Sequence, residues 1–256
     1  MRTYDAIEKV SSAIIKDNIC EAVFLKGSIA RGDDDEYSDV DMYVIVSEDK
    51  IEEFLSKRLD YLTSYKPVIY YSYVNFVGPQ IVVIFDDGLH FDLYAVTKGK
   101  ISTLDKAKII YDPDGLMNNY VAEIMYLKKD DYVEMFNDVL YSFIEADSAY
   151  KRKNYPWTSR ILDQSIAWCA ILLRYIYEPE HAYLGLKKIN EVLPTELYRL
   201  IETASKNLNE DGYGIANEKI ITILEHIEEN IDEDIRSKFN LNFLDWIKKN
   251  LNVILF

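Results

Sequence analysis

The sequence predicts an α+β fold, with a mixed β-sheet domain over residues 1–115 followed by an all-α helical-bundle domain over residues 116–256. Short apolar runs typical of strands recur in the first half and end near Gly115. Beyond this point apolar residues recur at helical spacing, and prolines separate the segments. Hydrophobic residues make up 49% of the 256 residues, which is enough for a packed core.

The first half opens with a helical pattern. Ile7, Val10 and Ile14 lie at helical spacing and predict a helix over residues 4–16. A second helix is predicted over residues 50–61. The predicted strands are 20–26, 39–46, 67–76, 80–85 and 89–96, with a short extended piece at 109–112. Turns at Gly78-Pro79 and Asp87-Gly88 separate the last three strands.

The second half has helical periodicity throughout. The predicted helices are 118–127, 131–153, 158–177, 181–193, 196–208, 218–230 and 241–250. Pro156, Pro179 and Pro194 mark breaks or first turns. Because this half is too large to be a simple cap, we expect it to form part of a cleft that binds an acceptor molecule.

A short motif in the first half indicates phosphate and metal chemistry. The strand at 20–26 runs into a Gly27-Ser28 turn, and the next strand opens with Asp39 and Asp41. Gly27 lets the backbone approach a ligand closely, and the amides and hydroxyl of the turn can hold phosphate oxygens. Residues two apart on a strand share a face, so the two carboxylates point together. Mg²⁺ prefers such hard oxygen ligands.

The motif resembles the signature of the nucleotidyltransferase superfamily that includes DNA polymerase β. The resemblance implies that Gly27 and Ser28 bind a nucleoside triphosphate and that Asp39 and Asp41 bind metal ions. It also implies a third carboxylate from a later strand, for which Asp92 is the candidate. A small catalytic sheet before a helical bundle is similar to antibiotic nucleotidyltransferases of the lincosamide and aminoglycoside type, which implies antibiotic resistance as a role.

The resemblance implies that an acceptor hydroxyl attacks the α-phosphorus and pyrophosphate leaves, with Mg²⁺ as cofactor and ATP as the expected nucleotide. Asp92 is the candidate ligand of a second metal and acceptor of the hydroxyl proton, although Glu145 or Asp147 from the helical half could instead be the base. Arg31 could contact the triphosphate or pair with the acidic run at 33–36. Lys153 and Arg160 could reach phosphates or form surface ion pairs.

Charge restricts the partners. A formal net charge of −15 opposes binding to a nucleic-acid backbone and favours a small cationic acceptor. The most apolar helical stretch, 166–177, is too short to span a bilayer, and residues 1–5 lack the apolar run of a signal peptide. Cys20 and Cys169 read as core thiols, so we expect a cytoplasmic protein without a membrane partner. The family also makes a homodimer plausible.

Two other readings stay open. One is an antitoxin-type nucleotidyltransferase that modifies a partner protein or RNA. In a related version the helical half cleaves RNA through Arg174 and His181, although Pro179 interrupts the helix between them. The other is a nucleotide-binding module without catalytic activity, which the complete set of three carboxylates argues against.

Overall fold

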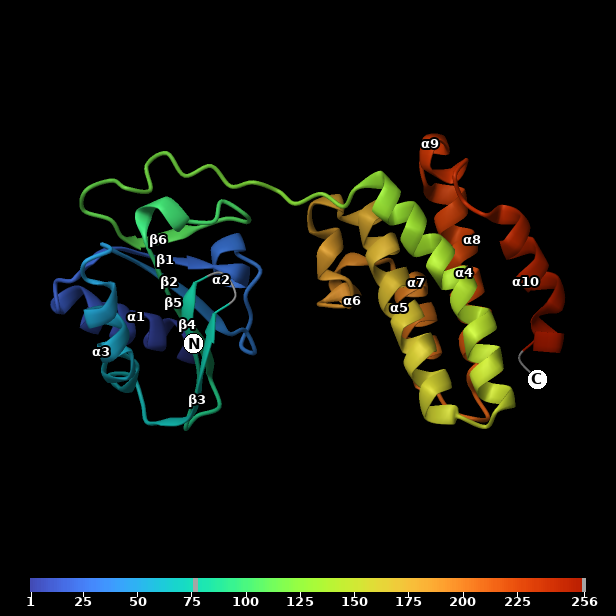
Figure 1. Ribbon diagram of the computed structural model, residues 1–256, viewed down its shortest axis with the longest axis horizontal. Coiled ribbons are helices and arrows are strands. Elements are labelled where there is room, and N and C mark those ends of the chain that lie inside the picture. The colour runs from blue at the N-terminus through green and yellow to red at the C-terminus, as the bar shows by residue number, and fades with distance from the viewer. Residues whose placement is uncertain (76–77, 255–256) are drawn as a thin grey trace. The chain divides into compact units, whose positions relative to one another are not determined.

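The computed structural model describes residues 1–75 and 78–254. The chain divides into two compact units, Met1–Ile124 and Met125–Phe256, whereas the sequence places the domain boundary after residue 115 (Figure 1). Phe76, the last residue of one predicted strand, lies outside the described residues. Among the described residues, none of the helices combines the length and the apolar character needed to cross a membrane.

The first unit contains a six-stranded sheet of order β3-β4-β5-β2-β1-β6. Its strands are β1 (Cys20–Lys26), β2 (Val40–Val46), β3 (Val68–Asn75), β4 (Pro79–Phe85), β5 (His90–Val96) and β6 (Lys108–Tyr111). Only β2 and β5 pair in parallel among the described strand pairs, and the other pairs are antiparallel. The predicted mixed sheet is therefore confirmed.

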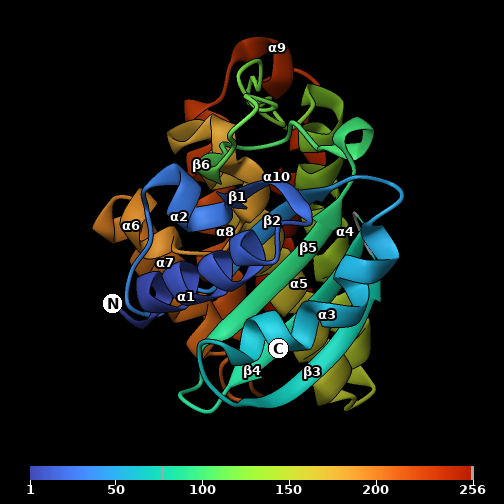
Figure 2. The same cartoon turned by 90° about the vertical axis from the view of Figure 1, so that its left-hand side faces the viewer.

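The helices of this unit are α1 (Arg2–Lys16), the short α2 (Gly27–Arg31), α3 (Ile51–Thr63) and the single 3₁₀ turn η1 (Lys98–Lys100). The apolar sides of α1 and α3 pack on one face of the sheet, which Figure 2 shows with both helices in front of the strands. Val10 and Phe54, both fully buried, meet Leu25, Met42 and Val44 there. Since side chains alternate along a strand, the residues between these core positions face the other side of the sheet.

The second unit is helical, as predicted, and has one main hydrophobic core. Its helices are α4 (Lys129–Lys151), α5 (Tyr155–Tyr177), η2 (Pro179–Leu184), α6 (Ile189–Val192), α7 (Thr195–Lys206), α8 (Tyr213–Asn230), α9 (Glu233–Arg236) and α10 (Leu241–Ile254). Pro156 lies in the first turn of α5, where its missing N–H costs nothing.

Two predicted helices are wrong. Residues 118–127 form turns and extended chain, because the Asp112 carboxylate accepts the backbone N–H groups of Leu116 and Met117 at 2.8 Å each and holds a turn there. The chain that follows pairs with an earlier loop through an isolated parallel β-bridge between Glu123 and Leu104. The predicted helix at 181–193 is split into η2 and α6, since Gly185 and Lys188 both adopt a positive φ of 52°.

Candidate active site

The turn after β1 brings backbone and carboxylate into contact. Gly27 has a φ of +67°, which only glycine adopts readily, and a Cβ built there would lie 2.3 Å from Asp41 Oδ2. Ser28 is buried in the following turn of α2, and its carbonyl accepts the N–H of Gly32 at 2.8 Å. The loop therefore places the Gly27 main chain directly against the Asp41 side chain.

The carboxylates from two strands share one face of the sheet. Asp41 and Asp92 are register partners on the parallel strands β2 and β5, so their side chains leave the sheet on the same side. That side is opposite the one packed by α1 and α3, because the intervening Val40, Met42 and Leu93 belong to the helix-covered core. Asp39 lies one residue before β2, although the sequence analysis included it in the strand.

His90 connects Asp39 with Asp92. Its Nε2 is 3.1 Å from Asp92 Oδ1, and its Nδ1 is 3.8 Å from Asp39 Oδ2. The pKa of His90 is raised, first by the hydrogen bond with Asp92 and then, against the opposing effect of partial burial, by the negative charges of Asp92, Asp39 and Asp41. One imidazole thus experiences all three carboxylates, which places them around a common region.

Sequence reasoning missed His90. A signal was present, because His90 and Asp92 are two residues apart on an alternating strand and so share a face. The same rule predicted the shared face of Asp39 and Asp41, and it applies equally to His90, two residues before the third carboxylate.

The donor set fits a hard divalent cation. Asp41 and Asp92 offer carboxylate oxygens on one face, with Asp39 just before β2, next to a turn whose Gly27 main chain lies against the Asp41 side chain. As these side chains stand, no group of three or more His, Cys, Asp or Glu residues within the described ranges is close enough to hold a metal ion. Asp39, Asp41 and Asp92 would be the residues that hold Mg²⁺, and this assignment stays a prediction.

Comparison with known proteins shows what the first unit resembles. Residues 7–112 match the model of the nucleotidyltransferase domain family. The first unit is therefore similar to nucleotidyltransferase domains. Across the whole chain, a crystal structure of an aminoglycoside 6-adenyltransferase from Bacillus subtilis is similar at 11% sequence identity and a TM-score of 0.38, covering 99% of both chains. No curated protein matches the chain.

Arg31, within the region that matches the family, is held by acidic side chains. Its guanidinium lies 2.7 Å from Asp105 Oδ2 and 3.3 Å from Asp33 Oδ1, and the side chain is 9% exposed. The pairing with Asp33 is one of the two readings that the sequence left open. Arg31 also ties the Gly27-Ser28 turn to the distant loop around Asp105, and contact with a triphosphate stays a prediction.

Lys26, the last residue of β1, is the register partner of Asp41. Its ammonium donates to the carbonyls of Ser102 and Leu104, at 2.7 Å each, instead of extending into solvent. Burial lowers the pKa of Lys26, and the nearby charge of Asp105 acts in the opposite direction. Lys26 thus fixes the loop at 102–105 beside the candidate active site.

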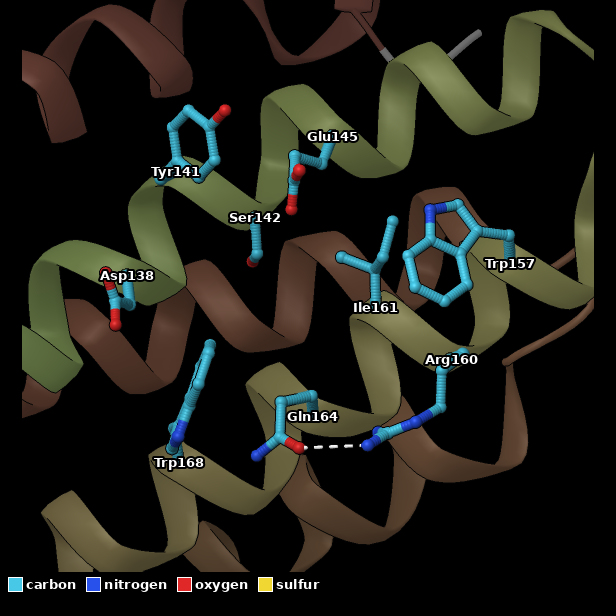
Figure 3. Close-up of a pocket in the computed structure, with 9 residues that line it drawn as sticks. All are labelled: Asp138, Tyr141, Ser142, Glu145, Trp157, Arg160, Ile161, Gln164 and Trp168. Carbon is cyan, nitrogen blue, oxygen red and sulfur yellow. Dashed lines mark hydrogen bonds between the residues drawn. The ribbon is translucent and has the colours of Figure 1, made fainter.

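The alternative bases from the helical unit differ in their surroundings. Asp147 is largely buried and forms an ion pair with Lys151 at 2.7 Å. Glu145 is exposed and lines a hollow of about 320 Å³ between α4 and α5 (Figure 3). Arg160 lines the same hollow and donates to Gln164 at 3.2 Å. Lys153 adopts a φ of 58° in the turn before α5.

Arg174 and His181, the residues of the RNA-cleavage reading, have structural partners. Arg174 is 2% exposed, pairs with Glu178 at 2.7 Å and donates to the carbonyl of Lys187. His181 Nδ1 lies 3.0 Å from the same Glu178. These contacts hold the turn after α5, and the burial of Arg174 leaves it poorly placed to contact RNA.

Proposed function

We propose that this protein transfers a nucleoside monophosphate from a nucleoside triphosphate to a hydroxyl of a small cationic acceptor and releases pyrophosphate. ATP is the expected nucleotide, and a lincosamide or aminoglycoside antibiotic is the expected acceptor. The observation that carries the proposal is the shared face of Asp41 and Asp92 beside the Gly27 backbone, in a region that matches the nucleotidyltransferase domain family.

Each residue has a stated role in this proposal. The backbone at Gly27 and the hydroxyl of Ser28 bind phosphate oxygens. The acceptor oxygen attacks the α-phosphorus in line, the bond to pyrophosphate breaks, and the carboxylate of Asp92 takes the hydroxyl proton. A divalent cation bound by Asp39, Asp41 and Asp92 would neutralise phosphate charge and make the hydroxyl more acidic.

Charge supports a small cationic acceptor. The net charge of −15 raises the local concentration of amines and repels a polyanion such as RNA. Participation of the helical unit in acceptor binding, a homodimer, and a cytoplasmic location where nucleoside triphosphates are available all remain part of the proposal.

Transfer of label tests the proposal directly. The purified protein is incubated with Mg²⁺ and each α-labelled nucleoside triphosphate, against aminoglycosides, lincosamides, RNA and a cell extract. We expect a labelled small molecule and stoichiometric pyrophosphate. Labelling of RNA or a protein partner alone would favour the antitoxin-type reading. Triphosphate binding without any transfer would favour the inert module.

A further inference from the structure

The hollow between α4 and α5 is lined by aromatic and charged side chains, which the packing of two helices does not require. Figure 3 shows Asp138 and Trp168 at one end and Glu145 and Trp157 at the other. Trp157, Ile161, Gln164 and Trp168 are spaced four, three and four residues apart, which puts them on one side of α5. Asp138, Tyr141 and Glu145 form the matching stripe on α4. The two neighbouring helices thus present aromatic and acidic side chains to the hollow between them.

The aromatic residues are large and accessible. Trp157 is 54% exposed and Tyr141 is 58% exposed, and Trp168 is half-buried. Ile161 and Ser142 form the floor, and the Ser142 hydroxyl already shares a hydrogen bond with the Ser165 hydroxyl at 2.6 Å. Exposed tryptophan and tyrosine faces attract cations and apolar ring systems. Among the described residues that form it, the floor has no unsatisfied polar group that a ligand would need to bind.

The carboxylates are available to a ligand. Within the described part of the chain, neither the Asp138 nor the Glu145 carboxylate forms a hydrogen bond or an ion pair. Two arginines also line this region, and both have partners. Arg160 donates to Gln164 at 3.2 Å and lies 3.7 Å from Asp163, and Arg152, in the adjoining hollow, donates to the carbonyl of Ser148 at 3.2 Å. Two carboxylates without partners beside aromatic faces favour a positively charged ligand and oppose an anion.

The space suits a ligand of more than one ring. A second hollow of about 260 Å³ adjoins the first, and both are lined by Tyr141, Glu145 and Trp157. Ligand pockets for small molecules have volumes of about 300 Å³ upward. Glu145 therefore borders both hollows.

We propose that the groove between α4 and α5 is a binding site for a small organic cation, with the amine held by Glu145 and the ring system packed against Trp157, Tyr141 and Trp168. The amine-bearing acceptor of the proposed function belongs to this ligand class. The site is independent of nucleotide chemistry, because the groove is built entirely from the helical unit.

Tryptophan fluorescence provides the test. Two of the three tryptophans line the groove, so a Trp246→Phe background reports on Trp157 and Trp168 alone. The full-length protein is titrated with kanamycin A, lincomycin and benzyltrimethylammonium, without nucleotide or Mg²⁺. Tetra-N-acetylkanamycin A serves as the uncharged partner of the first probe. We expect saturable quenching by at least one of these three cations, with a dissociation constant below about 1 mM, and none by the acetylated probe.

Matched variants locate the site. Glu145→Gln should weaken binding about tenfold, since it removes the counter-charge and keeps the shape. Trp157→Leu should weaken binding about fivefold through loss of the aromatic face, as measured by calorimetry. Glu134→Gln, the same change on an exposed α4 residue outside the groove, should leave binding unchanged.

Absence of binding by all three cations, or equal binding by wild type and Glu145→Gln, would overturn this site. Either result would leave the proposed nucleotide transfer standing, because the label-transfer experiment tests that activity separately. If Trp157→Leu melts early, the folded Glu145→Gln variant still decides the question.

Discussion

Gly27 and Asp41 occupy adjoining space: a Cβ on Gly27 would lie 2.3 Å from Asp41 Oδ2. The contact joins the first residue of α2, directly after β1, to the start of β2, and an acidic loop separates these two segments along the chain. Position 27 requires glycine for two separate reasons, the positive φ of +67° and the nearby carboxylate.

A comparison of the variants Gly27→Ala and Gly32→Ala separates these two reasons. Gly27→Ala should push the Asp41 carboxylate out of place and reduce nucleotide transfer by about a hundredfold or more, the scale of losing one electrostatic contact to the transition state. Gly32 has a φ of +86° but nothing within 4 Å of a built Cβ. Gly32→Ala should therefore lose only about 1 kcal/mol of stability from backbone strain and keep its activity.

Thermal melting and label transfer, measured on both variants, check this expectation. Equal loss of transfer in Gly27→Ala and Gly32→Ala would mean that backbone strain, and not the contact with Asp41, determines activity.

Asp41→Asn should abolish transfer and leave the fold intact, because it keeps the shape of the side chain and removes a charge that a metal ion would need. The variant should also lose the shift in melting temperature that Mg²⁺ and triphosphate produce in the wild type. Asp60→Asn, an exposed carboxylate on α3, is the matched control and should behave as wild type. Turnover of Asp41→Asn near the wild-type rate would contradict the proposed role of the carboxylates.

The sequence predicted the sheet domain and its motif because the signals there are local. Alternation placed Asp41 and Asp92 on core-forming strands, and their register then follows from the parallel pairing of β2 with β5. The contacts of Arg31 with Asp105 and of Lys26 with the carbonyl of Ser102 join residues far apart in the sequence, and no periodicity reports them.

In the helical half, too, local patterns were predicted and contacts between distant residues were not. Long apolar stripes such as that of α5 were predicted, whereas 118–127 is not helical because the side chain of Asp112 captures the backbone of the next turn. The groove was missed since Trp157, Ile161, Gln164 and Trp168 have the spacing of an ordinary core stripe. Only the packing of α4 against α5 shows that this stripe faces an open hollow.

Asp17 should make the first unit sensitive to acid. Its carboxylate accepts hydrogen bonds from Tyr61 at 2.5 Å and Lys57 at 2.9 Å, which joins the end of α1 to α3. These bonds, that from Tyr61 first, lower the pKa of Asp17 below 3.8, so the folded state favours the charged form. The stabilisation is present above pH 3.8 and is lost as the pH falls through the lowered pKa.

Asp17→Asn should cost about 1 kcal/mol at pH 7, and the difference from wild type should shrink below pH 3.8. Urea unfolding over this pH range measures it, and Tyr61→Phe completes a double-mutant cycle. A difference that is the same at pH 7 and pH 3 would show that the charge of Asp17 is not what stabilises this corner.

Arg174 should be a stability residue of the helical unit. Arg174→Ala leaves Glu178 without its buried partner and the Lys187 carbonyl without a donor, which should cost about 3 kcal/mol. Arg199→Ala removes an ion pair between side chains that are 64% and 83% exposed, and should cost less than about 0.5 kcal/mol. Calorimetry compares the two variants. A stable Arg174→Ala protein that has lost an RNA-cleaving activity would instead support the RNA-cleavage reading.

Salt should weaken the use of a cationic acceptor. Between 0.1 M and 1 M salt the Debye length falls from about 10 Å to about 3 Å, so an exposed site on a chain of net charge −15 loses most of its attraction for an amine. We expect the KM for an aminoglycoside or lincosamide acceptor to rise several-fold over this range while kcat changes little. The KM for the triphosphate, measured at saturating acceptor, corrects for any effect of salt on nucleotide binding. An N-acetylated acceptor that still carries the reacting hydroxyl should show a salt-independent KM. If charged and acetylated acceptors respond equally to salt, the acidic surface does not select the acceptor.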